Sequence, residues 1–102
     1  MTEFEKMRNG KIFNTTVPEL KEKFLRAHNL CYAYNKTYED ETEKRNKILD
    51  QLLPNRGTDV FLQGPVFFDY GENTIISDNT FINYNFTALD SDETIALLPE
   101  GL

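Results

Sequence analysis

A six-residue repeat in the C-terminal half is the feature that most restricts the fold of this chain. Aliphatic side chains recur every six residues at Ile76, Ile82 and Ala88, and Tyr70 and Thr94 continue the same phase. Each six-residue unit can form one short strand and one corner, and three units close a triangular coil with the aliphatic side chain inside. The spacing therefore predicts the first coils of a parallel β-helix. Meandering β structure is the alternative, because it also contains short apolar runs separated by Asn.

Turn-forming residues support the coil interpretation. Asn79 and Asn85 occupy the fourth position of their repeats, and Asp78 and Asp90 occupy the third. Asn and Asp tolerate left-handed backbone angles and can hydrogen-bond to the local backbone. We therefore expect these four residues at the corners of the coils.

The N-terminal half instead carries helical patterns. Capping-box pairs mark three helix starts: Thr2 with Glu5, Thr16 with Glu19, and Asp40 with Glu43. One face of the second helix is apolar, formed by Leu20, Phe24, Ala27, Cys31 and Tyr34. The charged run 41–45 is interpreted as a solvated face, and Pro54 ends the third helix. The change of pattern predicts a mixed α and β chain, with a helical cap in residues 1–54 and β-helix coils in residues 55–102.

Composition excludes several classes of function. The formal net charge of −6 and pI near 4.7 argue against nucleic-acid binding, which needs clustered Lys and Arg. The sequence has neither a long apolar run nor a secretory leader pattern, so we expect a cytoplasmic protein without a membrane span. One cysteine and one histidine make a zinc site implausible, and no metal is expected. Cys31 is interpreted as a packing residue rather than a nucleophile, because it lies on the apolar helix face.

Several segments, in this order, resemble the maltose and galactoside O-acetyltransferases. They are residues 7–13 (MRNGKIF), 25–35 (LRAHNLCYAYN), 43–45 (EKR) and 65–73 (PVFFDYGEN). The resemblance covers residues 4–92. It implies a helical cap on a left-handed β-helix, a homotrimer, and transfer of an acetyl group from acetyl-CoA to a sugar hydroxyl at sites between subunits.

The resemblance also implies roles for individual residues. Asn83 matches an asparagine that stabilises the tetrahedral intermediate and contacts both acetyl-CoA and the sugar. Asp69 is expected to contact the acceptor sugar, as are Asp90 and Ser91, although Ser91 replaces an acidic residue of the family. Thr15 stands near another acidic acceptor-binding position, and this departure weakens the expected contact. From the residues alone, Asn83 could simply be a corner residue and Asp69 a turn residue.

A general base is missing from the matched pattern. The family places its catalytic histidine in a Gly-His-Pro-like stretch, which these 102 residues do not contain. His28 lies in the predicted cap and is expected to have a surface or interface role. After Asp92 the hexads give way to a poorly fitting tail, so we expect a truncated enzyme portion that is itself inactive. The alternative is a non-catalytic sugar-binding or assembly remnant of the family.

Overall fold

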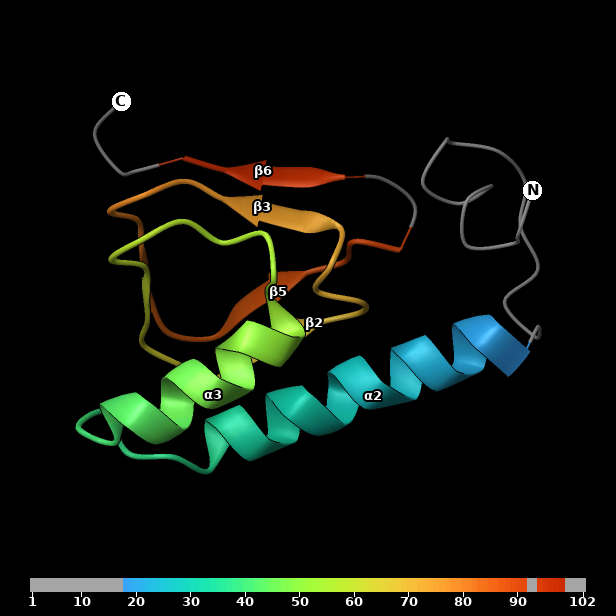
Figure 1. Cartoon of the computed structure of the whole chain (residues 1–102), viewed down its shortest axis with the longest axis horizontal. Coiled ribbons are helices and arrows are strands. Elements are labelled where there is room, and N and C mark those ends of the chain that lie inside the picture. Colours follow the sequence, from blue (N-terminus) through green and yellow to red (C-terminus); the bar gives the residue numbers. More distant parts are fainter. Residues whose placement is uncertain (1–17, 92–93, 99–102) are drawn as a thin grey trace.

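The computed structural model describes residues 18–91 and 94–98, which form two helices followed by six short strands (Figure 1). The helices are α2 (Pro18–Asn35) and α3 (Thr42–Leu52). The strands are β1 (Phe61–Leu62), β2 (Val66–Phe68), β3 (Thr74–Ile76), β4 (Phe81–Ile82), β5 (Phe86–Ala88) and β6 (Ile95–Leu97). The predicted first helix, with its start at Thr2 and the start at Thr16 of the second, lies outside the described residues.

The strands form three two-stranded parallel sheets, which pair β1 with β4, β2 with β5, and β3 with β6. Phe61 pairs with Phe81 and Val66 with Phe86, a separation of 20 residues, whereas Thr74 pairs with Ile95, a separation of 21. The chain therefore returns to the same side after each full turn, and the described strands make two stacked three-sided coils (Figure 1). Parallel pairing excludes the meandering alternative.

The predicted interior residues of the coils are confirmed. The exposed fractions of Ile76, Ile82 and Ala88 are 1%, 7% and 3%. The prediction for Thr94 is wrong, because its side chain is exposed. Leu97, which pairs with Ile76, packs against the core instead, because it follows Ala88 by nine residues, three more than the six-residue repeat allows.

The predicted corners at the two asparagines are also confirmed. Asn79 and Asn85 have φ angles of 60° and 57°, in the left-handed region that Asn tolerates. The Asn79 corner lies above a corner of the first coil, since the Asn79 N–H donates to the Thr58 carbonyl at 2.9 Å. The Asp78 carboxylate accepts the Thr58 N–H at 2.7 Å in return. Corner residues thus tie the coils together between the strands.

Most of the predicted helix packing is observed, with two corrections. Leu20, Ala27, Cys31 and Tyr34 of α2 are buried. Phe24, by contrast, is 40% exposed and lies outside the core, and its ring packs on His28 with ring centroids 3.8 Å apart. The capping box predicted for Asp40 and Glu43 is wrong. Helix α3 has Glu41 at its N-cap with no side-chain cap bond, and the Glu41 carboxylate accepts the Tyr38 N–H instead.

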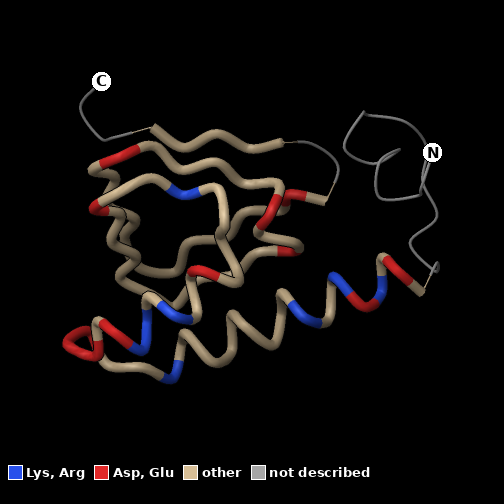
Figure 2. The backbone as a smooth tube through the Cα atoms, viewed as in Figure 1, with Lys and Arg blue, Asp and Glu red and all other residues tan. Residues whose placement is uncertain are grey.

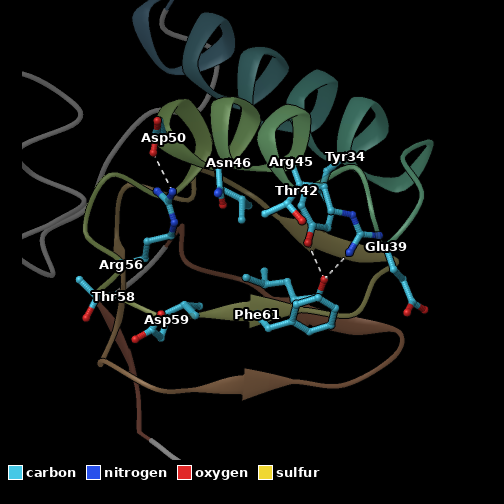
Figure 3. A pocket seen from close by; sticks show the side chains of 14 residues that line it. Tyr34, Glu39, Thr42, Arg45, Asn46, Asp50, Arg56, Thr58, Asp59 and Phe61 are labelled. Carbon is cyan, nitrogen blue, oxygen red and sulfur yellow. Dashed lines mark hydrogen bonds and ion pairs between the residues drawn. The ribbon is translucent and has the colours of Figure 1, made fainter.

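The prediction that residues 41–45 form a solvated face fails at Arg45, which is 6% exposed. Its guanidinium donates to Thr37 Oγ1 at 2.9 Å and to the Leu62 carbonyl at 3.1 Å, and it lies 4.7 Å from the centre of the Tyr34 ring. The Tyr34 hydroxyl donates to the same carbonyl (Figure 3). The corner after β1 presents buried carbonyl groups, and a buried cation with several donors satisfies them.

Side chains of α2 cover the outer edge of β2. The Asn35 amide donates to the Val66 carbonyl at 2.9 Å and accepts the Val66 N–H at 2.8 Å, as a neighbouring strand would. Two residues further on, Phe68 donates its N–H to Cys31 Sγ at 3.3 Å. The spacings agree, because four helical residues rise about 6 Å and two strand residues span about 6.6 Å.

On the other two sides of the first coil, backbone groups that point away from the second coil also have hydrogen-bond partners. The Leu62 carbonyl of β1 is taken by Tyr34 and Arg45, and residues 55–57 pair with Ile76 at the end of β3. The helices and residues 55–57 therefore cover one end of the coil stack. An exposed strand edge is a pairing hazard, and here the fold removes it.

Candidate functional site

Asp69 and His28 form the most suggestive polar pair of the described residues. Asp69 follows β2 at the corner toward β3, and α2 passes over this corner. The His28 Nε2 atom lies 3.3 Å from Asp69 Oδ1, with 33% and 18% of the two side chains exposed. Because a carboxylate only accepts, this geometry makes Nε2 the protonated nitrogen of the imidazole. No sequence pattern joins these residues, which are 41 positions apart.

This pair stands at a small cavity of about 170 Å³ between α2 and the end of β2. Its walls are largely apolar and include Tyr32, Phe67 and Leu89, and Cys31 lies against it. A few polar groups at an apolar cavity are the usual composition of a small-molecule site. The cavity can therefore hold a small ligand that has both apolar and hydroxyl faces.

Cys31 is unsuited to nucleophilic chemistry in this cavity. Burial raises the pKa of its thiol, and the negative charges of Asp90 and Asp69 raise it further, although the hydrogen bond from Phe68 opposes both effects. The thiol therefore stays protonated near neutral pH, and only the thiolate is a strong nucleophile. Its interpretation as a packing residue agrees with this environment.

Asn83 lines a different cavity. It follows β4 at an exposed corner and borders a space of about 360 Å³ together with Phe81, Tyr84 and Leu98. Its Oδ1 atom accepts the Tyr84 N–H at 2.8 Å, which leaves the NH₂ end of the amide to donate to a ligand. The described chain therefore does not bring Asn83 and Asp69 into one pocket.

Asp90 lies in the interior, with an exposed fraction of 0%. Its carboxylate accepts the Tyr70 N–H at 2.8 Å and the Thr74 hydroxyl at 2.9 Å, and its carbonyl accepts the Asn73 amide at 2.9 Å. These bonds hold the corner that carries Asp69. The adjacent Ser91 is half-buried, and Thr15 lies outside the described residues. Contacts of Asp90, Ser91 and Thr15 with a substrate stay predictions.

A larger cavity of about 720 Å³ lies between α3 and the first coil (Figure 3). Two guanidinium groups border it, but both are engaged within the protein. Arg45 binds the carbonyls described above, and Arg56 pairs with Asp50 at 2.6 Å. The remaining charged groups at this cavity, Glu39 and Asp59, are acidic. This cavity is therefore a poor site for an anionic ligand.

Charge is unevenly distributed along the chain. Lys and Arg lie mainly along the two helices (Figure 2), and the sequence contains neither residue after Arg56. Within residues 18–91 and 94–98, no cluster of three His, Cys, Asp or Glu side chains could hold a metal ion. The same residues contain no helix that is long and apolar enough to span a membrane.

Comparisons with known proteins agree with this architecture. Residues 6–57 match the maltose acetyltransferase hexapeptide capping motif. The galactoside O-acetyltransferase of Escherichia coli K12 is 34% identical over 93 residues, which are 91% of this chain and 45% of that protein. The chain spans about half the length of the curated relatives it matches.

Two solved structures extend the comparison to three dimensions. A maltose O-acetyltransferase from Clostridium difficile 630 matches with a TM-score of 0.87 and 35% identity, over 98% of this chain and 53% of that one. A hexapeptide-repeat acetyltransferase from Vibrio cholerae, solved with acetyl-CoA, matches with a TM-score of 0.85 and 27% identity, over 96% and 52%. The cap and the stacked coils thus define the class as hexapeptide-repeat acetyltransferases. Within that class, the chain belongs to the maltose and galactoside acetyltransferase family.

Proposed function

We propose that this chain is part of an acetyl-CoA-dependent O-acetyltransferase that acts on a sugar hydroxyl. The observation that carries the proposal is the match of cap and coils to a maltose O-acetyltransferase over nearly the whole chain. The coils are proposed to be left-handed and the full enzyme to be a cytoplasmic homotrimer, as in the family that the sequence resembles. The reaction is direct transfer in a ternary complex, without a covalent enzyme intermediate.

Asn83 is proposed to stabilise the oxyanion that forms as the sugar hydroxyl attacks the acetyl carbonyl. Its exposed position at a corner and its available NH₂ group suit this role. A neutral amide donor binds more tightly as negative charge develops, and removing such a donor costs about 3 kcal/mol of transition-state stabilisation. Asp69 is proposed to accept a hydrogen bond from a hydroxyl of the acceptor sugar.

The separation of Asn83 and Asp69 supports an assembled active site. The two residues border different cavities of one chain. If a neighbouring subunit supplied one of them, a single substrate could meet both. A trimer with sites between subunits meets this requirement.

The described residues suit only the acetyl end of acetyl-CoA. The Asn83 corner is flanked by apolar side chains that suit the pantetheine arm. The phosphates of the nucleotide need cations, and the coil segment contains no Lys or Arg after Arg56. Those contacts are therefore proposed to come from other coils or another subunit. We also propose that the 102 residues alone are inactive, because the only histidine, His28, lies in the cap and contacts Asp69.

A chimaeric enzyme tests the proposal. The 102 residues would replace the matching half of the Clostridium difficile maltose O-acetyltransferase, and thiol release from acetyl-CoA would be followed with maltose as acceptor. We expect turnover, a loss of about 10²-fold or more in kcat for Asn83→Ala, and little change for the nearby corner control Asn85→Gly. Equal activity of the two variants would remove the role proposed for Asn83.

The unfused chain distinguishes the alternative function. A non-catalytic sugar-binding or assembly remnant should bind sugar or a partner subunit without releasing CoA. Turnover by the unfused chain at a rate comparable to the chimaera would show that the proposed inactivity is wrong.

A further inference from the structure

We propose that His28 is a positioning residue of the acceptor pocket, where its hydrogen bond orients the Asp69 carboxylate at a cavity that fits a single sugar ring. This inference rests on the proposed function, since it assigns the cavity at Asp69 to the acceptor. It adds His28 to the residues of the acceptor pocket, whereas the sequence alone predicted a surface or interface role for it.

The first step of the argument is the hydrogen bond itself. A free carboxylate can accept bonds from two hydroxyls at once. Here Asp69 Oδ1 faces His28 Nε2 at 3.3 Å, so this bond uses one of the carboxylate's acceptor sites and holds the carboxylate in one orientation. His28 therefore fixes how the Asp69 carboxylate is presented to a hydroxyl of the acceptor.

The second step is that both partners are held in place. The Phe24 ring packs on the imidazole with centroids 3.8 Å apart, which fixes the ring from the side of the preceding helical turn. Asp69 lies on a corner held by the buried Asp90, through the N–H of Tyr70. The pair is thus part of a supported arrangement rather than a contact between two mobile surface groups.

The third step is the charge around the pair. The nearby cation of α2, Lys23, lies 3.1 Å from Glu72, so its ion pair is with that carboxylate. The remaining carboxylate of this corner, Asp90, is buried and bonded to the backbone and to Thr74. Asp69 and His28 therefore supply the carboxylate and the imidazole that line the cavity, beside the Tyr32 hydroxyl and the Cys31 thiol.

The fourth step is the size of the cavity. Its volume is about 170 Å³, and an engineered cavity of about 150 Å³ holds one benzene molecule. The space therefore matches one six-membered ring. The apolar walls at Tyr32, Phe67 and Leu89 suit the C–H face of a pyranose, while Asp69 Oδ2 accepts from a hydroxyl. The predicted ligand class is a monosaccharide, or the terminal ring of a longer sugar.

The test measures binding of methyl α-D-glucopyranoside and of maltose to the ¹⁵N-labelled 102-residue chain by NMR titration. His28→Ala should weaken glucoside binding by roughly three- to tenfold, because Asp69 loses the hydrogen bond that orients it. His28→Gln, which restores an N–H donor, should recover most of that loss. Arg26→Ala, an exposed change on the same helix, is the matched control. Amide spectra and melting temperatures establish that each variant is folded.

Coupling to Asp69 is the second readout. In an Asp69→Asn background, His28→Ala should cause little further loss, because the two residues act as one unit. Maltose should bind within about threefold of the glucoside, since only one ring enters the cavity.

The outcomes separate this inference from the proposed function. Equal binding by His28→Ala and Arg26→Ala, failure of His28→Gln to rescue, or much tighter binding of maltose would overturn the inference alone, provided that Asp69→Asn weakens binding. If Asp69→Asn binds like the wild type, the role of Asp69 in the proposed function fails as well. An absence of sugar binding by the wild-type chain also overturns the inference, and activity of the chimaera then decides the proposed function independently.

Discussion

Removing the guanidinium of Arg45 should cost about 3 kcal/mol of folding free energy. Arg45→Met keeps most of the apolar stem but removes the close bonds to Thr37 Oγ1 and to the Leu62 carbonyl. Two bonds of a charged donor contribute about 1.5 kcal/mol each at the lower end of their range, and a cation over Tyr34 adds about 0.5–1 kcal/mol. Burying the charged guanidinium costs desolvation free energy, and the methionine variant avoids that cost, which offsets part of this sum.

Urea unfolding followed by circular dichroism measures the loss. The midpoint should fall while the slope stays constant, as expected for a change in stability alone. Lys44→Met is the matched control, because Lys44 is its exposed neighbour on α3 and changes of this kind usually cost less than about 0.5 kcal/mol. Tyr34→Phe should be less than additive with Arg45→Met, since both side chains donate to the Leu62 carbonyl. Equal midpoints for the two methionine variants would refute this account of Arg45.

The remaining predictions concern the corners and the buried tyrosines. Asp90→Ala should lower the unfolding free energy by about 2–3 kcal/mol and speed hydrogen exchange at the Tyr70 amide. Unchanged exchange there would contradict the role of Asp90 in holding this corner. Gly71→Ala should lower the unfolding free energy more than Asn79→Ala does, because a Cβ at Gly71 would lie 2.1 Å from the carbonyl oxygen of Leu52 at the end of α3. Urea midpoints in the reverse order would disprove this. Asn79→Gly should stay within about 0.5 kcal/mol of the wild type, since glycine accepts its φ of 60°, and a loss above 1 kcal/mol would point to a side-chain role. Burial raises the pKa of Tyr34 and of Tyr70, so their contribution to stability is complete below about pH 10 and is lost as pH rises through the higher folded values; urea midpoints that rise above pH 10 would contradict the sign.

The coils were predictable from sequence because their pattern is local and repeated. Ile76, Ile82 and Ala88 fall six residues apart, and geometry requires that positions in one phase face the same way. Asn79 adopts the corner conformation that its residue type favours. The failure at Thr94 has a simple cause, since the corner between Ala88 and Leu97 holds three residues more than the repeat predicts, and no periodic argument can place such an insertion.

The polar contacts of the candidate site were not predictable in the same way. His28 and Asp69 are brought together by the packing of α2 on β2, a tertiary contact that neither segment encodes alone. Arg45 looks like a surface residue because its neighbours are charged, and only the corner carbonyls explain its burial. Resemblance to a family named Asn83 and Asp69, but it could not show that they border different cavities of one chain.

The covering of the first coil by the helices has a consequence for self-association. Asn35 and Cys31 occupy the backbone groups of β2 on the side facing away from β5. Together with Tyr34 and Arg45 at β1, these side chains close the helix-covered end of the coil stack to further strand pairing. Without α2, these backbone groups would be open to pairing with a strand of another molecule. The helical segment therefore covers the strand edges at one end of the coil stack and also forms a wall of the cavity at Asp69.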